Sequence, residues 1–390
     1  MWELLFLLLP IAALSGWIAG RRLSRPSSGD NGIKLSSEYF QGLNFLINDK
    51  PDRAIDAFIR MLDSTPDSVE TTLALGNLFR KRGEVDRAIR LHQKLISQPL
   101  LTAQQRRQSV FELGQDYMRA GVYDRAESLF LELTNSVGDQ LATSVKHLID
   151  IYEREKDWDK AVKMSQKLQN MTGQFMGREI AHYRCEQAQV AWAKGSIRKA
   201  LRYLKSSVTA DKFCVRSSLI QGDIDRAQGR YRQALNAYQQ VQHQDMAYIS
   251  EAIQPVTECY VKMGAESQLI NYFEQLLRIS PNISVMLASV SHLKNYLGLS
   301  RTAEMLADYI YKHPSIQGLA QLIDLHVHQS EHLHRREWVV LKTLIERLLV
   351  KKPSYKCGHC GFAYKTLHWQ CPSCRHWSTV KPILALETEL

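Results

Sequence analysis

The sequence predicts an all-α fold, a long superhelix of stacked helical hairpins, preceded by an apolar helix and followed by a small cysteine-rich ribbon. Three observations carry this prediction. A pattern of small and apolar residues recurs about every 34 residues, residues 4–20 carry no charge, and two Cys-x-x-Cys motifs lie near the C-terminus. The hydrophobic content of 45% and the charged content of 23% are ordinary for a folded chain and exclude wholesale disorder.

Residues 1–20 are expected to form a transmembrane anchor. The 17 residues from Leu4 to Gly20 are at the short end of what spans a bilayer at about 1.5 Å per residue. Arg21, Arg22 and Arg25 follow directly. Basic residues beside a first span mark its cytoplasmic flank, so we expect the N-terminus to face outward and the rest of the chain to face the cytoplasm. A cleaved signal peptide, the alternative, carries its positive charge before the apolar run rather than after it.

Residues 21–34 are rich in Ser, Gly and Pro and are expected to form a juxtamembrane linker. The repeat pattern then runs through residues 35–352 and is clearest in the segment from Leu75 to Leu95. There Gly83 is expected to end a first helix, and Gly76 and Ala88 to lie where the two helices approach most closely. Other copies are marked by Gly42, Gly114, Tyr152, Ala188, Gly222, Tyr260 and Gly298.

This period resembles that of the tetratricopeptide repeat, a helix-turn-helix unit that cannot bury its apolar face alone and therefore stacks into a superhelix. The resemblance implies about eight to nine repeats and a groove that binds peptide segments. For each groove candidate the alternative is an ordinary solvated helix face. The candidates, chosen because they are offset from the packing positions, are Asn77, Arg80, Phe111, Met118, Arg216, Asp223 and Arg226.

Residues 353–390 are expected to form a rubredoxin-like metal ribbon. Four thiolates complete a tetrahedral shell for Zn²⁺, or for iron in the same site, and a closed shell of this kind argues against a hydrolytic role. Gly358 and Gly361 are expected to relieve the tight backbone of the turns. The four ligands occur in two pairs separated by ten residues: Cys357, Cys360, Cys371 and Cys374.

Three function classes are open on these residues. The chain contains no phosphate-binding loop, nucleophile elbow or metalloprotease motif, so we expect a protein that is not an enzyme. The first class is an adaptor that holds substrates in its groove, and the second is a redox protein whose ribbon carries iron, which would be red where zinc is colourless. The net charge of +10 allows the third, a nucleic-acid binder that uses the ribbon and the basic helix at residues 335–352.

The N-terminal span, the long repeat array and the C-terminal ribbon together resemble the lipopolysaccharide assembly protein B family of Gram-negative bacteria. The resemblance covers the whole chain and rests on the anchor with Arg21 and Arg22, the repeat frame from Gly42 to Ala303, and the motifs CGHCG and CPSC. The spacing between the two motifs is far shorter than in true rubredoxins, which argues against electron transfer.

That resemblance implies a single-pass adaptor in the inner membrane, with its N-terminus in the periplasm and its repeats and C-terminus in the cytoplasm. The implied partners are the membrane protease FtsH, the lipid A deacetylase LpxC whose degradation it promotes, and other inner-membrane proteins of the lipopolysaccharide pathway. No nucleic-acid partner is expected, and a homodimer is left open.

Overall fold

The structure, a computed structural model, describes residues 37–48, 50–64, 69–135, 138, 140–329, 332–351 and 353–383. The predicted anchor, residues 1–20, and the predicted linker, residues 21–34, lie outside these ranges. Within them, no helix combines the length and the apolar character needed to cross a bilayer. The chain divides into two compact units, Met1–Ala126 and Glu127–Leu390.

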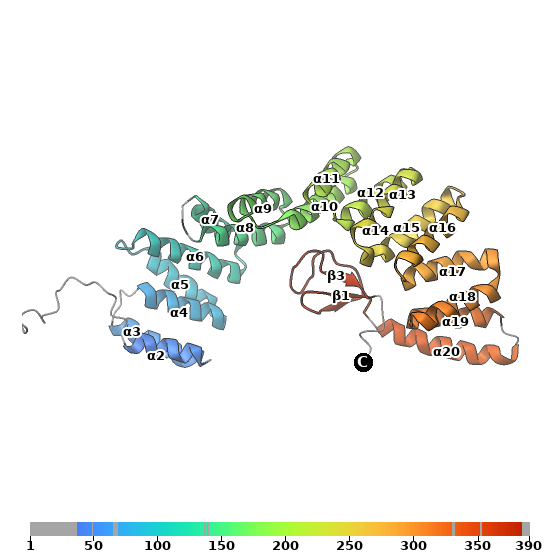
Figure 1. The fold of residues 1–390 in the computed structure, drawn as a ribbon. Helices are drawn as coiled ribbons and strands as arrows, with labels where there is room; N and C mark the ends of the chain where they lie inside the picture. The colour runs from blue at the N-terminus through green and yellow to red at the C-terminus, as the bar shows by residue number, and fades with distance from the viewer. Residues whose placement is uncertain are drawn as a thin grey trace, which may run out of the picture. The chain divides into compact units, whose positions relative to one another are not determined.

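The described residues are mostly helical, which confirms the predicted helical array (Figure 1). Consecutive helices pack on each other as hairpins, for example α4 on α5 and α10 on α11. The first unit contains α2 Ser37–Ile47, α3 Pro51–Ser64, α4 Val69–Arg82, α5 Val85–Ile96 and α6 Ala103–Ala120, and α7 Tyr123–Thr134 spans the boundary. The second unit begins with α8 Leu141–Glu155, α9 Trp158–Thr172, α10 Gly177–Ala193, α11 Ile197–Ala210, α12 Val215–Ala227, α13 Tyr231–Gln239, α14 Val241–Gln244 and the 3₁₀ helix η2 Met246–Tyr248. It continues with α15 Ile249–Lys262, α16 Glu266–Ile279, α17 Ile283–Leu297, α18 Leu299–Lys312, α19 Ile316–Gln329 and α20 His332–Lys351.

Most hairpin turns among the described residues contain a residue in the left-handed backbone region. Gly83 fills this place after α4 with a φ of 92°, as predicted. The fourth repeat lacks a glycine in its frame, and Lys156 adopts the same conformation after α8 with a φ of 58°. A residue with a Cβ is strained there, but the packing of α8 on α9 still closes the hairpin.

The glycines of the first helices lie against large side chains of the second helices. A Cβ added at Gly76 would lie 2.4 Å from Nε2 of His92, so the predicted close approach is confirmed. Its nearest partner, however, is the side chain of His92, sixteen residues along the chain, rather than Ala88, which is also fully buried. Gly222 meets the ring of Tyr238 at the same separation.

Replacing Gly222 by alanine should therefore lower the melting temperature of the protein. The added Cβ would lie 2.4 Å from the ring of Tyr238, which is fully buried. Overpacking of this kind typically costs about 1–3 kcal/mol. Thermal unfolding followed by circular dichroism measures the effect. Combining the change with Tyr238→Leu provides the control, because a clash predicts that the double variant loses less stability than the sum of the single variants, and additive losses would contradict it.

The ribbon follows α20 and packs inside the second unit. Its strands β1 Tyr355–Cys357, β2 Ala363–Tyr364 and β3 Val380–Pro382 form an antiparallel sheet in the order β2-β1-β3. The ribbon lies on the inner side of the arc formed by the helices of this unit (Figure 1). Leu367 and Trp369 pack against the apolar cluster that α13, α15 and α16 share. The array therefore provides a surface on which the ribbon is docked.

The last helix, α20, buries only part of its apolar face. Ile345 is buried, but Leu341 and Leu344 are exposed. A terminal repeat has no following neighbour to cover its outer face.

Candidate metal centre and its docking surface

The four predicted cysteine ligands come together in the ribbon. Their Sγ atoms all lie within 4.8 Å of one another, and those of Cys357 and Cys374, and of Cys360 and Cys371, are 3.7 Å apart. Four thiolates about 2.3 Å from one ion in a tetrahedron have sulfur atoms about 3.8 Å apart. The donor set and its spacing therefore fit a single tetrahedral metal ion held by these four residues.

The two Cys-x-x-Cys turns share one backbone conformation. The N–H of Gly361 donates to the carbonyl of Cys357 at 2.9 Å, and the N–H of Arg375 donates to the carbonyl of Cys371 at 2.8 Å. Gly361 and Arg375 have φ values of 77° and 61°. The predicted need for glycine is thus confirmed at Gly361 but is wrong at Gly358, which does not adopt a positive φ.

Hydrogen bonds lower the pKa of the cysteine thiols, whereas burial and neighbouring cysteines raise it. Burial by itself raises the pKa of Cys357, but a hydrogen bond with the Thr379 hydroxyl and backbone N–H groups of the same turn lower it to about 6. At Cys374 a backbone hydrogen bond lowers the pKa, whereas burial and the three other cysteines raise it, to about 12. Adjacent thiolates repel one another until a cation neutralises them, so binding of a metal would release protons.

A nearly buried carboxylate, Glu153 of α8, holds the ribbon on the array. Its side chain is 10% exposed and accepts hydrogen bonds from Trp377 Nε1 at 2.8 Å, Gln370 Nε2 at 3.0 Å and Arg375 at 3.2 Å. The hydroxyl of Tyr183 in α10 also donates to it, at 2.6 Å. Three donors of the ribbon and one of the array thus share a single acceptor group.

Aromatic rings surround this carboxylate. Trp377 is 6% exposed and stacks on His182 with ring centroids 4.9 Å apart, and it meets Tyr183 and Trp158 edge-on. Nε2 of His182 lies 2.5 Å from Oγ of Ser378. Burial, with smaller contributions from nearby arginines, lowers the pKa of His182 to about 3, so the imidazole is neutral at pH 7.

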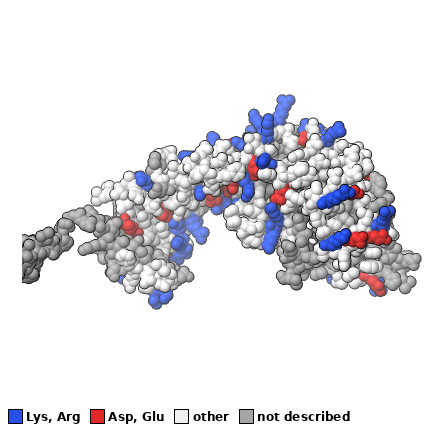
Figure 2. All heavy atoms as spheres, in the orientation of Figure 1, with Lys and Arg blue, Asp and Glu red and all other residues white. Residues whose placement is uncertain are grey.

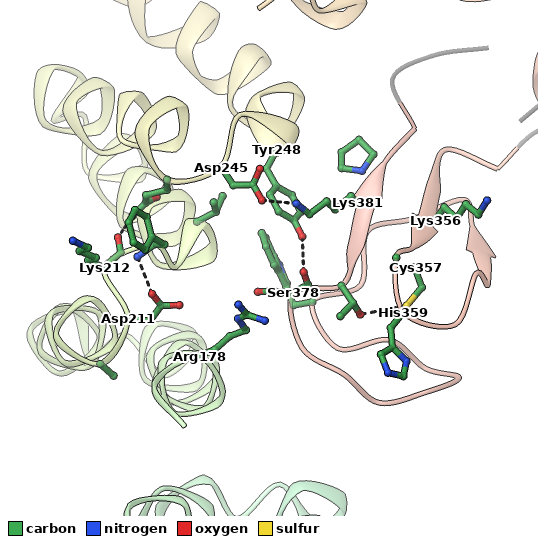
Figure 3. Close-up of a pocket in the computed structure, with 18 of the residues that line it drawn as sticks. Arg178, Asp211, Lys212, Asp245, Tyr248, Lys356, Cys357, His359, Ser378 and Lys381 are labelled. Carbon is green, nitrogen blue, oxygen red and sulfur yellow. Dashed lines mark hydrogen bonds and ion pairs between the residues drawn. The ribbon is translucent and has the colours of Figure 1, made fainter. Parts of the chain in front are cut away.

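A second contact joins the strands of the ribbon to η2 and α15. The hydroxyl of Tyr248 donates to a carbonyl of β3 at 2.9 Å, and that of Tyr355 donates to Glu251 at 2.9 Å. Lys381 forms an ion pair with Asp245 at 2.8 Å. Figure 3 shows Tyr248 and Asp245 facing Lys381 where the ribbon meets the helices. The ribbon is therefore fixed at two places along the array.

Sequence reasoning missed this docking surface. The sequence did contain one indication of it, the two tryptophans Trp369 and Trp377. A ribbon of about 30 residues is too small to bury two tryptophans within itself and needs a partner surface. Glu153 and His182 have no comparable signature, since each occupies an ordinary position of a repeat helix.

The predicted groove residues belong to repeat helices and not to the ribbon that holds the four cysteines. Three of them are arginines whose side chains pair with carboxylates of a neighbouring repeat, so these charges contribute to stacking within the array. The pairs are Arg80 with Glu112 and Asp116, Arg216 with Glu186, and Arg226 with Glu258.

The other groove candidates are also engaged or partly covered. Phe111 is 7% exposed and packs in the core rather than facing solvent. Asp223 accepts a hydrogen bond from Tyr238 at 2.7 Å, and Asn77 and Met118 are half-buried. Binding of a partner through these side chains stays a prediction.

Three segments of the chain match known families. The rubredoxin metal binding domain matches residues 355–382, and the tetratricopeptide repeat matches residues 71–104 and residues 185–249.

Among solved structures, the crystal structure of MamA is 19% identical with a TM-score of 0.33, covering 44% of this chain and 94% of that chain. A tetratricopeptide repeat protein from Parabacteroides merdae is 11% identical with a TM-score of 0.32, covering 74% of this chain and 96% of its own.

Similarity to two relatives extends over the whole length. Lipopolysaccharide assembly protein B of Escherichia coli (strain K12) is 36% identical over 390 residues, which cover 99% of this chain and 100% of that protein. The protein of the same name from Haemophilus influenzae is 34% identical over 396 residues, covering 98% of each chain. At this identity and coverage, the chain belongs to the lipopolysaccharide assembly protein B family.

Proposed function

We propose that this protein is a non-enzymatic adaptor that regulates lipopolysaccharide assembly at the cytoplasmic face of the inner membrane. The observation that carries the proposal is the full-length similarity to proteins named lipopolysaccharide assembly protein B. The four-Cys centre supports a role without catalysis, because a closed tetrahedral shell leaves no position for a substrate. A repeat array with a docked ribbon offers a broad surface for other proteins.

We infer further that the adaptor presents the deacetylase LpxC to the membrane protease FtsH and so lowers lipopolysaccharide output. The predicted anchor supports this step. A flexible linker of about 14 residues spans only about 20 Å on average, which would confine the array beside a membrane-bound protease. Such confinement can raise the apparent affinity of two partners by about 10²–10⁴.

The ion is proposed to be a structural zinc. Its role here would be to hold the ribbon in the conformation that places Trp377 beside Glu153, a role that needs no change of oxidation state. Iron in the same four-Cys site is the alternative, and the colour of the purified protein separates the two.

Turnover of LpxC in Escherichia coli tests the proposed function. In a strain that lacks its own lipopolysaccharide assembly protein B, we expect LpxC to persist after protein synthesis is stopped, and this full-length chain to restore its rapid decay. In a strain whose FtsH is inactive, the chain should have no effect. A shortened chain that begins at Ser27 and is expressed at the native level should fail to restore decay. If LpxC decays at the same rate with and without the chain, the adaptor mechanism is wrong. If the shortened chain restores decay fully, the anchor has no role in the mechanism.

A further inference from the structure

A large cleft lies between the ribbon and the array of the second unit, next to the docking contacts (Figure 3). One wall is formed by the start of α10, the end of α11 and the loops before α12 and η2, and the other by the ribbon around Cys357 and β3. Its volume is about 1450 Å³. Pockets for small molecules usually measure about 300–1,000 Å³, so this cleft has room for a longer ligand.

Two exposed aromatic rings line the cleft. Phe175 is 65% exposed and Phe213 is 56% exposed, and each lies two residues before the first helix of its repeat. The ring of Phe175 rests against the backbone of Gly177, where an added Cβ would lie 2.2 Å from it. A ring held in this way on the surface offers apolar contact area at little cost in conformational entropy.

The cleft also carries an excess of positive charge. Its lining includes four Lys or Arg side chains and two Asp side chains. Lys381 is neutralised by Asp245 at 2.8 Å, but Arg178, Lys212 and Lys356 form no ion pair with any carboxylate among the described residues. Figure 3 shows Arg178 pointing into the gap between the array and the ribbon, with Lys212 and Lys356 on opposite sides of it.

We propose that this cleft binds an acidic peptide segment of a partner protein that also carries an aromatic or aliphatic side chain. The unpaired cations are spread across both walls, which suits carboxylates spaced along an extended peptide better than one compact phosphate group. Phe175 and Phe213 supply the apolar contact for the accompanying side chain. The proposal rests on the adaptor function proposed above, but it assigns a site and a ligand class that this function does not specify.

Selection from random peptides tests the class of ligand. Metal-loaded full-length protein is offered a phage-displayed library of random twelve-residue peptides. We expect the selected peptides to be enriched in Asp and Glu and to contain a Phe, Trp or Leu. An enriched peptide labelled with fluorescein should bind more weakly as the salt concentration rises, because its carboxylates meet unpaired cations. Selection of peptides without an acidic excess would overturn the proposal.

Variants of exposed residues then test the site. We expect Arg178→Glu to weaken binding of the selected peptide about tenfold, and Phe213→Ser about fivefold, in fluorescence polarisation. Arg198→Glu makes the same change of charge in α11, outside the cleft, where Lys and Arg side chains gather over the helix (Figure 2), and it should change the affinity less than twofold. Equal losses in the two charge variants, or none in Arg178→Glu, would overturn the site.

A competition experiment with phosphate ligands tests whether the cleft prefers phosphate groups to an acidic peptide. Millimolar inorganic phosphate, or vesicles containing phosphatidylglycerol, should not displace the labelled peptide from the wild-type protein. Displacement by either would assign the cleft to a phosphate-bearing ligand instead and overturn the proposal. Since the assay uses purified protein, peptide binding that depends on Arg178 supports the site even where LpxC turnover proves independent of this chain.

Discussion

Replacing Glu153 by alanine should release the ribbon from the array while the four cysteines keep their metal. The change removes a carboxylate that is 10% exposed and leaves its donors, Trp377 Nε1 and the Arg375 side chain among them, without this acceptor. Each unpaired buried polar group costs about 1–3 kcal/mol. Backbone amides of residues 355–382 should therefore exchange with deuterium at least about tenfold faster, as measured by mass spectrometry.

Glu155→Ala is the matched control, because it removes the same charge from an exposed position of the same helix. Exchange of the ribbon amides in this variant should equal that of the wild type. Metal content measured in parallel separates release of the ribbon from its unfolding, since release alone leaves the ion bound. Unchanged exchange in Glu153→Ala would show that the stacking of Trp377 holds the ribbon without the carboxylate.

Replacing Cys371 by serine should remove the ion and unfold the ribbon. Cys371 is fully buried, and its Sγ lies 3.7 Å from that of Cys360 and 3.0 Å from the hydroxyl of Tyr364. Binding of zinc contributes about 10–16 kcal/mol to the folding of small four-ligand modules, so a ribbon of this size cannot fold without it. Metal content should fall from about one ion per chain to nearly none. Tryptophan emission should shift to the red as Trp369 and Trp377 become exposed to water.

Cys259→Ser controls for the loss of a buried thiol outside the ribbon, in α15, and should keep its metal. The helical signal in circular dichroism should persist in both variants, because each repeat of the array is stabilised by its neighbours. Full metal content in Cys371→Ser would contradict the four-Cys site. A red wild-type protein would contradict zinc and assign iron to the same ligands.

The repeated hairpin and the metal ligands could be predicted from the sequence, because both depend on residues close together in the chain. Gly83 ends α4 as its position in the repeat predicts, and the two Cys-x-x-Cys pairs each close a short turn. The same local reasoning could not identify His92 as the partner of Gly76, because helix spacing predicts a close approach but not which side chain fills it. It also could not foresee that Arg80 and Arg216 form ion pairs with carboxylates of a neighbouring repeat.

The position of the ribbon, and the cleft beside it, depend on contacts between distant parts of the chain and could not be predicted from the sequence. Trp377 and Glu153 are 224 residues apart, and no periodicity links positions so distant. Their contact depends on the curvature of the array, which accumulates from small rotations between successive repeats and brings α8, α10 and α15 around the ribbon (Figure 1). The cleft beside Arg178 arises from the same arrangement, because each of its walls comes from a different part of the fold.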